Sequence, residues 1–386
     1  WIRLFENLEY VVIDELHHYR GVFGSHLANI IRRLKRICAF YGSNPKFICC
    51  SATIANPQEL AEKVVASPVR LIQNNGAPQG DRHFLFYNPP VVNAELGIRK
   101  SAVKEVARLT THFLSKDVQS IVFARSRLRV EILTTYLKDA VKKMGKSPEL
   151  IKGYRGGYLP TERRAIEQGL RKGEIMSVVS TNALELGIDI GSLDVCIMTG
   201  YAGNIASTWQ QAGRAGRRSN TALVVLVASS APLDQYIINH PEYFFEQSPE
   251  HATIDPNNLS IMTSHIKCAA FELPFMDDEA FGLDHASTQE VLHYLEEHRV
   301  LRHVRNKWHW SADTYPAEEV SLRTAAPGNV VILDTSDHGR VIGEIDLFAA
   351  PTEVYEDAIY IHQSVQYTIE RLDLEDRKAY ARPVET

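Results

Sequence analysis

The stretch Val11-Val12-Ile13-Asp14-Glu15-Leu16-His17 ends an apolar run with two adjacent carboxylates. Its first residues predict a buried β-strand, so the acids stand where that strand leaves its sheet. Open α/β folds bind ligands at this edge. Asp14 can there hold Mg²⁺ through water, and Glu15 can orient or deprotonate an attacking water. An isolated Asp-Glu pair is usually an exposed loop feature, so this interpretation depends on the other motifs.

A glycine-spaced arginine pair occurs much later, in Gln210-Gln211-Ala212-Gly213-Arg214-Ala215-Gly216-Arg217. Arg214 and Arg217 are three positions apart, which on a helix would place them on one face. The glycines permit close backbone approach, and the planar, permanently charged guanidinium groups suit a γ-phosphate. Gln210 can position water. Together with the acidic pair, this segment supplies most of an NTP-hydrolysing site, split across two domains.

Apolar strands and amphipathic helices alternate over the first 230 residues or so, which predicts parallel α/β sheets. A linker is expected at 74–80, where Asn, Gly and Pro gather. Strands are predicted at 10–13, 46–50, 69–72, 120–124, 176–180, 195–198 and 222–228, and helices at 25–40, 98–114, 127–144 and 161–171 and from Pro57.

The pattern changes after Pro232. A helix is predicted over 258–271, and a capping box at 287–290 precedes a predicted helix over 291–298. The stretch 300–310, with a turn at Asn306, then predicts the hairpin that ends a winged helix. Later β-rich stretches predict a small β-barrel, with strands at 330–333, 340–345 and 358–361.

Composition sets further limits. The 386 residues are 45% hydrophobic and 23% charged, as in ordinary globular domains, and no apolar run reaches the roughly 18 residues that a membrane helix needs. We therefore expect no membrane association. The net charge of −5 argues weakly against nucleic acid, but binding depends on local basic surface. The five cysteines have no Cys-x-x-Cys spacing, so neither a zinc site nor a disulfide framework is indicated.

The motifs, in this order, resemble those of superfamily 2 helicases. Asp14-Glu15-Leu16-His17 resembles their DExH box and Ser51-Ala52-Thr53 their third motif. The segment 120–127 resembles the fourth motif, 178–189 the fifth and 210–217 the sixth. The resemblance implies two RecA-like parallel-sheet domains of α/β class, the first truncated, followed by a winged-helix-like region and a small β-rich domain. The expected boundaries are 1–75, 76–235, 236–315 and 316–386.

The resemblance also assigns roles to individual residues. Asp14 would hold Mg²⁺, Glu15 would act as the base, and Gln210, Arg214 and Arg217 would complete the catalytic set. The remaining expected contacts are those of His17, Gly187 and Asp189 with the nucleotide, and those of Ser51, Thr53, Arg125 and Thr181 in coupling or nucleic-acid binding. Arg125 could equally belong to a solvated basic turn. The basic face Arg32, Arg33, Lys35 and Arg36 is expected to be solvated surface.

The sequences of segments 14–26 and 183–191 resemble one group in particular, the mitomycin repair factor A or YprA-like family. Segments 239–245, 360–363 and 372–375 are also similar to that family. This implies an ATP- and Mg²⁺-dependent DNA helicase moving 3′ to 5′ in DNA repair, on single-stranded or forked DNA, in the cytoplasm with the bacterial nucleoid or in a nucleus. An RNA helicase or remodeller of the same superfamily, or a non-catalytic DNA-binding scaffold, are the alternatives.

One expected motif is absent from this sequence. A phosphate-binding Gly-x-x-x-x-Gly-Lys-Ser/Thr loop is required, but Gly145-Lys146-Ser147 lacks the first glycine because Ala140 stands there. It also follows a predicted helix instead of a strand. The loop is expected upstream of Trp1 and a cysteine-rich zinc module beyond Thr386, so the isolated chain should bind and hydrolyse ATP poorly.

Overall fold

The structure is a computed structural model that describes residues 1–52, 54–74, 76, 80–154, 160–185, 193–216, 221–322, 329–337, 339–362 and 365–384. Contacts divide the chain into two compact units. The first unit comprises 1–50, 57–70 and 252–386, and the second comprises 51–56 and 71–251. Within the described ranges, no helix combines the length and apolar character needed to cross a bilayer.

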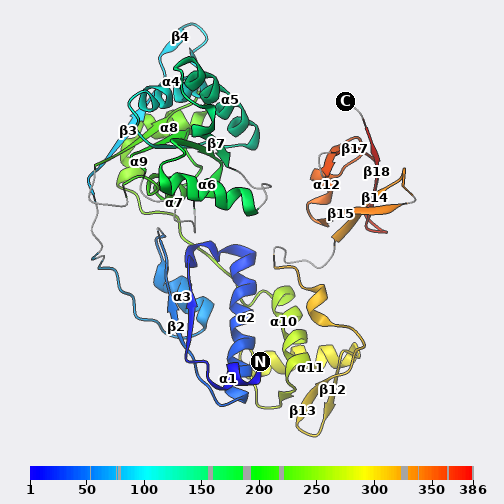
Figure 1. Ribbon diagram of the computed structural model, residues 1–386. Helices are drawn as coiled ribbons and strands as arrows, with labels where there is room; N and C mark the ends of the chain where they lie inside the picture. The colour runs from blue at the N-terminus through cyan, green and yellow to red at the C-terminus, as the bar shows by residue number, and fades with distance from the viewer. Residues whose placement is uncertain are drawn as a thin grey trace. The chain divides into compact units, whose positions relative to one another are not determined.

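A six-stranded parallel sheet forms the centre of the second unit (Figure 1). Its spatial order is β3-β10-β9-β6-β8-β7, and β6, β8 and β9 are buried along their entire length, as strands covered on both faces must be. The strands are β3 (Arg82–Tyr87), β6 (Ser120–Phe123), β7 (Ile151–Tyr154), β8 (Ser177–Ser180), β9 (Val195–Thr199) and β10 (Ala222–Val227).

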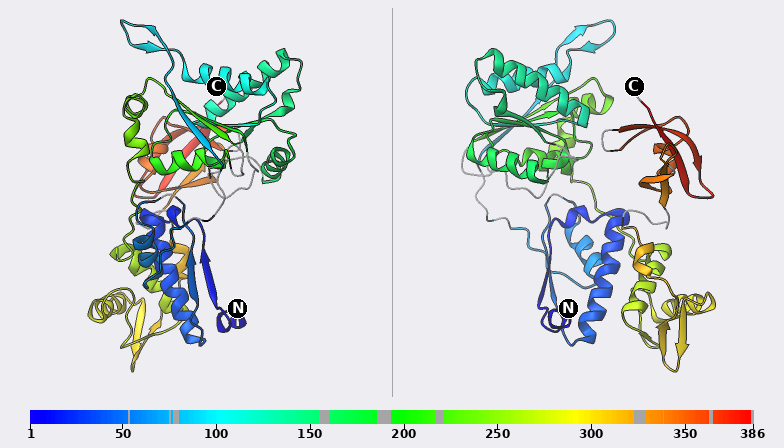
Figure 2. Two further views of the ribbon diagram at one scale, coloured as in Figure 1. Left: turned by 90° about the vertical axis from the view of Figure 1, so that its left-hand side faces the viewer. Right: turned by 45° about the vertical axis from the view of Figure 1, so that its right-hand side comes forward.

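Helices cover both faces of this sheet and enclose two separate apolar cores. One core is closed by α4 (Ala102–Leu114) and α5 (Arg127–Lys143). The other core takes side chains from α6 (Pro160–Lys172), α7 (Ile205–Ala212), α8 (Pro232–Asn239) and α9 (Pro241–Phe245). A small hairpin of β4 (Val91–Asn93) and β5 (Ile98–Arg99) projects from the domain body (Figures 1 and 2). These features confirm the predicted parallel α/β architecture.

The first unit opens with a shorter parallel pair, β1 (Tyr10–Ile13) and β2 (Lys46–Cys49). The helices of this part are α1 (Ile2–Glu6), η1 (Leu16–His18), α2 (Gly21–Phe40) and α3 (Pro57–Val65). The α2 helix packs on α3 and also on α10 (Leu259–Glu272), which belongs to the winged-helix region.

The winged-helix region has its own apolar core, with Trp308 among its largest buried side chains. Its three-stranded antiparallel sheet has the order β11-β13-β12. The further elements are β11 (Phe275–Met276), α11 (His285–Glu297), β12 (Leu301–Val304), β13 (Lys307–Trp310) and η4 (Pro316–Glu319). The helix-then-hairpin order confirms the predicted winged helix.

A five-stranded sheet forms the C-terminal part, in the order β15-β14-β18-β17-β16. The sheet curls strongly. β15 and β16 are its two edge strands, yet a Cβ added at Gly343 on β15 would lie 2.5 Å from the Tyr360 hydroxyl on β16. This agrees with the predicted small β-rich domain. Its elements are β14 (Asn329–Asp334), β15 (Arg340–Asp346), α12 (Ala350–Glu353), β16 (Ile359–His362), β17 (Val365–Asp373) and β18 (Lys378–Pro383).

Three local predictions were wrong. Residues 69–72 form no strand, and Ile72 is largely exposed. The helix predicted from Ile98 begins at Ala102, because residues 98–99 pair in the β4–β5 hairpin. The helix expected after a capping box at 287–290 already begins at His285, since the side chain of Asp284 caps it by accepting a hydrogen bond from the Ser287 amide.

The basic face of α2 was also predicted wrongly. Arg33 and Arg36 are mostly buried and form ion pairs with Glu272 and Glu279 of the winged-helix region, so they are not solvated surface. Lys35 donates to the Val65 carbonyl at the end of α3. The physical reason is that this helix has packing partners on two sides, and one of them is more than two hundred residues away in the sequence.

Candidate nucleotide and nucleic-acid site

The acidic pair lies at the carboxyl end of β1, as predicted. Ile13 is paired with Cys49 in register, and the Leu16 amide donates to the Cys50 carbonyl at 2.8 Å, so the chain turns away immediately after the strand. Asp14 is exposed at this turn, and its carboxylate accepts a hydrogen bond of 2.9 Å from the Glu15 amide. One oxygen of Asp14 thus orients the backbone of its neighbour, while the group as a whole faces solvent.

Glu15 has an unusual backbone conformation. Its φ is 51° and its ψ is 44°, in the left-handed region that costs a non-glycine residue about 1–2 kcal/mol. The surrounding packing must maintain this conformation, and the almost fully buried Leu16 anchors the chain directly after it. Strained residues of this kind concentrate at functional sites, where the geometry of one side chain has to be fixed.

His17 is buried beside Glu15. Its Nε2 lies 3.5 Å from a carboxylate oxygen of Glu15. Burial, together with the nearby His18 and Arg20, lowers the pKa of His17 to about 4, against an opposing contribution from Asp14. The imidazole is therefore neutral at physiological pH, so it acts near Glu15 as a hydrogen-bonding group and not as a cation.

The third motif follows β2 directly. Cys50 donates its amide to the Ile13 carbonyl at 2.9 Å, and Ser51 comes next in the chain. The hydroxyl of Ser51 is exposed and donates to the Ala52 carbonyl at 3.4 Å. Thr53 lies outside the described residues, so its predicted coupling role has no structural description.

Arg125 of the fourth motif is held inside its own domain. Its guanidinium forms an ion pair with Asp234, whose side chain is completely buried, and donates to the Tyr201 carbonyl at 2.6 Å. Asp234 also accepts from the Tyr201 amide at 3.1 Å and from the Ser229 amide at 2.9 Å. Gly200 is required here, because its φ is 85° and an added Cβ would lie 2.7 Å from both charged groups. The phosphate contact of Arg125 stays a prediction.

Thr181 of the fifth motif stands at the end of β8. Its hydroxyl oxygen accepts a hydrogen bond from the Ala183 amide at 3.4 Å and thereby caps the short helix η3 (Asn182–Leu184). The hydroxyl proton is not used in this bond, so it can be donated to a phosphate. Gly187 and Asp189 lie outside the described residues.

The sixth motif differs from the expected helical face. The helix α7 ends at Ala212, so Arg214 lies in the turn beyond it, and Arg217 lies outside the described residues. Gln210 is half-buried on α7. The expected placement of Arg214 on a helix was wrong, because α7 ends at Ala212, and the position of Arg217 stays a prediction.

Glu185 connects the fifth and sixth motifs. Arg214 is buried and donates through Nε to the Glu185 carbonyl at 3.0 Å, and Gln211 donates to the Glu185 carboxylate at 3.0 Å. Ser207 donates its hydroxyl to the same carboxylate. A buried carboxylate among these donors fixes the orientation of the loop that carries Arg214.

Three sequence profiles match consecutive parts of the chain. They are the DEAD/DEAH box helicase family over residues 1–60, the helicase conserved C-terminal domain over 102–219 and the winged helix domain of the ATP-dependent helicase HRQ1 over 254–325. The helicase YprA of Bacillus subtilis is 58% identical over 100% of this chain and 51% of its own length. A crystal structure of the DUF1998 helicase MrfA bound to DNA matches with a TM-score of 0.82 and 58% identity, over 100% of this chain and 52% of that one.

The chain belongs to the superfamily 2 helicases, in the group of YprA and MrfA. The ATP-dependent helicase HRQ1 of Saccharomyces cerevisiae is 34% identical over 100% of this chain and 36% of its own length. The chain thus spans about half, or less, of the length of these curated relatives. The family prediction made from the motifs is confirmed.

In this helicase-family chain, Asp14 fits the requirement for Mg²⁺. Among the described residues, no group of three or more His, Cys, Asp or Glu side chains could hold a metal ion. Mg²⁺, however, is usually bound by one or two carboxylates together with water and substrate phosphates. The exposed Asp14 carboxylate at a strand end is compatible with a site of this kind, and its Mg²⁺ contact stays a prediction.

Sequence reasoning missed Glu185 and Asp234, the two buried carboxylates that orient predicted site residues in this family member. Glu185 stands within the fifth-motif string, and its position among apolar neighbours was the available signal. Asp234 follows Pro232 in the first turn of α8, where an acidic residue reads simply as a helix-start preference. For Asp234, the sequence therefore carries no signal that distinguishes it from an ordinary helix acid.

Proposed function

We propose that this chain is the motor part of an ATP-dependent DNA helicase that moves 3′ to 5′ along single-stranded or forked DNA and acts in DNA repair. One observation carries the proposal: a strained glutamate and an exposed aspartate at the end of a parallel strand, in a chain 58% identical to YprA. Two of the MrfA structures that match were solved with DNA, and one of these two also with the nucleotide analogue AMPPNP. These matches support DNA and ATP as the ligands.

Each predicted site residue would have a separate role in ATP hydrolysis. Asp14 would hold Mg²⁺ through water, and the metal would neutralise charge on the β- and γ-phosphates of ATP. Glu15, fixed by its left-handed backbone, would orient and deprotonate the attacking water, which Gln210 would help to position. Arg214 and Arg217 would stabilise the charge of the transferred phosphoryl group, and such arginine fingers contribute about 10³–10⁵ in rate.

The remaining residues would transmit hydrolysis to the nucleic acid. Ser51 and Thr53 would couple it to domain closure, His17 would bridge to them, and Gly187 and Asp189 would lie by the nucleotide. Thr181 and Arg125 would contact the phosphates of the strand, because hydroxyl and guanidinium donors suit phosphate oxygens. For Arg125 this requires donors other than the Nη2 bonds to Tyr201 and Asp234.

We further propose that the isolated chain binds ATP weakly. Its sequence contains no complete phosphate-binding loop, and Gly145-Lys146-Ser147 follows the helix α5. Lys146 donates to the Leu114 carbonyl at 3.0 Å and to Asp117 at 2.5 Å, so its ammonium group is engaged in the domain surface. Adding MgATP should therefore leave the thermal midpoint of this chain within about 1 °C, because stabilisation requires ligand well above its Kd.

The decisive experiment replaces Glu15 by Gln in the intact protein. DNA-stimulated ATP hydrolysis should fall by about 10² or more, since the general base is lost, while DNA affinity stays within about twofold. Glu6→Gln is the matched control, because Glu6 is an exposed glutamate of the same unit. Unchanged turnover in the Glu15 variant would overturn the proposal.

The nucleic acid is tested separately. ATP hydrolysis by the unmodified intact protein is measured with single-stranded DNA and with RNA of the same sequence. Stronger stimulation by DNA supports the proposal, whereas stronger stimulation by RNA assigns the protein to RNA. Binding without hydrolysis on either strand would indicate a scaffold.

A further inference from the structure

The segment that leads into the winged helix is bonded to the first half of α2. The Gly21 amide donates to the Thr253 carbonyl at 2.7 Å, and the Asp255 amide donates to the Ser25 hydroxyl at 2.9 Å. The side-chain amide of Asn29 donates to the Pro256 carbonyl, also at 2.9 Å. Residue numbers increase in the same direction on α2 and on this segment, so the segment runs alongside the first half of α2 in the same direction.

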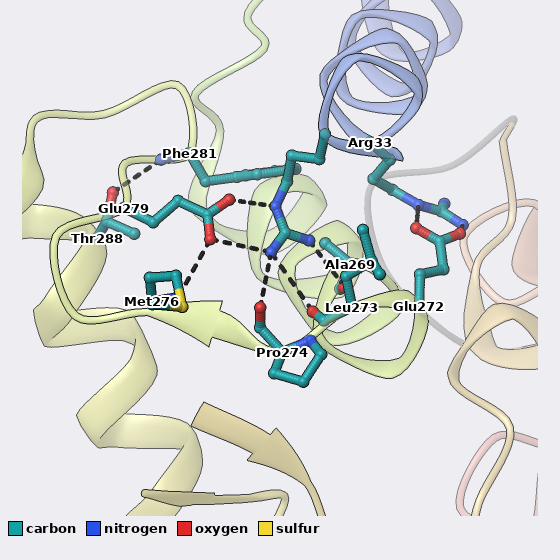
Figure 3. Close-up of polar contacts among 10 residues, drawn as sticks. Arg33, Ala269, Glu272, Leu273, Pro274, Met276, Glu279, Phe281 and Thr288 are labelled. Atoms are coloured by element: carbon teal, nitrogen blue, oxygen red, sulfur yellow. Dashed lines mark hydrogen bonds and ion pairs between the residues drawn. The ribbon is translucent and has the colours of Figure 1, made fainter. Parts of the chain in front are cut away.

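Arg36 binds the second half of α2 to the winged helix. Only 12% of its side chain is exposed, and its guanidinium forms an ion pair with Glu279. It also donates through Nη1 to the Ala269 carbonyl at 2.9 Å and lies 3.8 Å from the centre of the Phe275 ring. Glu279 in turn accepts from the Met276 amide at 3.2 Å (Figure 3). One guanidinium thus joins a helix end, a strand and a loop of the winged helix.

Arg33 makes a second, directed connection. Its Nε donates to Glu272 at 3.1 Å, a pair that Figure 3 shows, and its Nη1 lies 3.2 Å from Nδ1 of the buried His265. Because a guanidinium can only donate, His265 must accept at Nδ1 and carry its proton on Nε2. That Nε2 then donates to Nδ1 of the buried His26 at 2.9 Å.

The two surfaces also fit sterically at Gly282. Its φ is 73°, and a Cβ built there would lie 2.1 Å from Cζ of Arg32. Arg32 occupies this space while donating to the Asn257 side chain at 2.8 Å. A side chain at Gly282 would require a strained backbone and would displace the partly buried Arg32, so the close approach of the two surfaces here depends on glycine.

The acidic motif lies just before the N-terminal end of the same helix. Asp14 and Glu15 lead through η1 directly into α2, and an added Cβ at Gly24 would lie 2.3 Å from the Tyr19 carbonyl oxygen and 2.5 Å from Ile254. The 20 residues of α2 span about 30 Å. A rigid helix of this length therefore follows the acidic motif, after η1, and has the winged helix along its side.

We propose that Arg33 and Arg36 are positioning residues that fix the winged helix to α2, the helix that follows Asp14, Glu15 and η1 in the chain. The β12–β13 hairpin then keeps a constant position relative to the acidic motif throughout the ATP cycle. This rests on the proposed helicase function. In this proposal the β12–β13 hairpin is the element that meets the duplex. ATP hydrolysis then does not require the contact with α2, whereas strand separation does, because a loosely held hairpin would be displaced by the duplex.

The contact itself is tested by amide hydrogen exchange on this 386-residue chain. In Arg36→Glu, amides of 259–276 should exchange roughly tenfold faster, because two carboxylates then face each other. Adding Glu279→Arg should restore the exchange to within about twofold of the original. Lys63→Glu is the control, since it reverses one charge of an exposed pair with Glu59 on α3.

Arg36→Gln serves if the charge reversal prevents folding, with a smaller increase of about threefold expected. Unchanged exchange in the folded Arg36 variants would overturn the proposal, as would failure of the double variant to restore protection. These outcomes do not depend on ATP hydrolysis, so they are independent of whether the proposed function is correct.

The functional consequence is measured in the intact protein. For Arg36→Gln we expect DNA-stimulated ATP hydrolysis within about twofold of the original, while base pairs separated per ATP fall about tenfold. A parallel fall in both, or no fall in either, would overturn the positioning role. If the unmodified protein hydrolyses no ATP with any strand, the proposed function fails, and the exchange result alone judges the contact.

Discussion

Acidification should weaken the first compact unit through His265. This side chain is fully buried, and it faces Arg33, Arg32 and His26 of α2. Burial, and then the charges of these neighbours, lower the pKa of His265 from 6.5 to about 3. The folded form therefore resists the proton that the unfolded chain accepts.

The direction and size of the effect follow from this difference in pKa. A depressed folded-state pKa gives stability that is present above about pH 6.5 and is lost as the pH falls toward the folded value. Between about pH 7.5 and about pH 5, one such group lowers the free energy of unfolding by about 2 kcal/mol. His17, with its pKa lowered to about 4, adds a similar loss in the same interval.

The perturbation that isolates His265 is His265→Gln. Glutamine can accept from Arg33 through its oxygen and donate to His26 through its amide, but it does not titrate. Opening free energies of α10, measured by amide exchange at both pH values, should show about half the acid loss in this variant. His112→Gln, at an exposed histidine of the second unit, is the control and should change nothing. An acid loss in His265→Gln as large as in the unmodified chain would refute the reasoning.

Three other outcomes are expected. Asp234→Ala should lower the melting temperature of the second unit by about 2–12 °C, since it leaves the buried Tyr201 amide, the part-buried Ser229 amide and Arg125 without their shared acceptor at a cost of about 1–3 kcal/mol; calorimetry checks this, and a shift below about 1 °C would contradict it. Gly24→Ala should destabilise the first unit by about 1–3 kcal/mol in urea unfolding, because its Cβ would strike backbone. Cys50, the exposed thiol, should react first with a thiol reagent, ahead of the buried thiols; simultaneous reaction would show that the native fold is not protecting them.

The central strands of the six-stranded sheet were predictable because each contains a continuous apolar run in the sequence. Continuous apolar runs such as 222–227 predict a strand buried on both faces. By contrast, β7 has only four residues, including a lysine and a glycine, so it carries almost no propensity signal. The run 69–72 has the composition of a strand but gains no sheet partner in the structure. Strand formation there depends on tertiary pairing, which composition does not encode.

The site shows the same division. The place of Asp14 and Glu15 at a strand end followed from the apolar run before them, but the left-handed backbone of Glu15 did not. The partners of Arg33 and Arg36 lie 239 and 243 positions away, so the arginines looked like a solvated helix face. Long-range ion pairs cannot be predicted from the local periodicity of a sequence, whereas the order and spacing of motifs can be read from it directly.

The first unit is assembled from two stretches of chain, 1–70 with a short gap and 252–386, with the second unit encoded between them. During translation, the face of α2 that receives Glu272 and Glu279 therefore emerges long before its partners. At about 5–20 residues per second, a ribosome needs some 12–50 seconds to deliver them. In that interval the nascent first stretch displays unneutralised arginines and uncovered apolar side chains, while the inserted domain can already fold. Newly made protein should thus be most exposed to chaperone capture and misassembly until α10 has been synthesised.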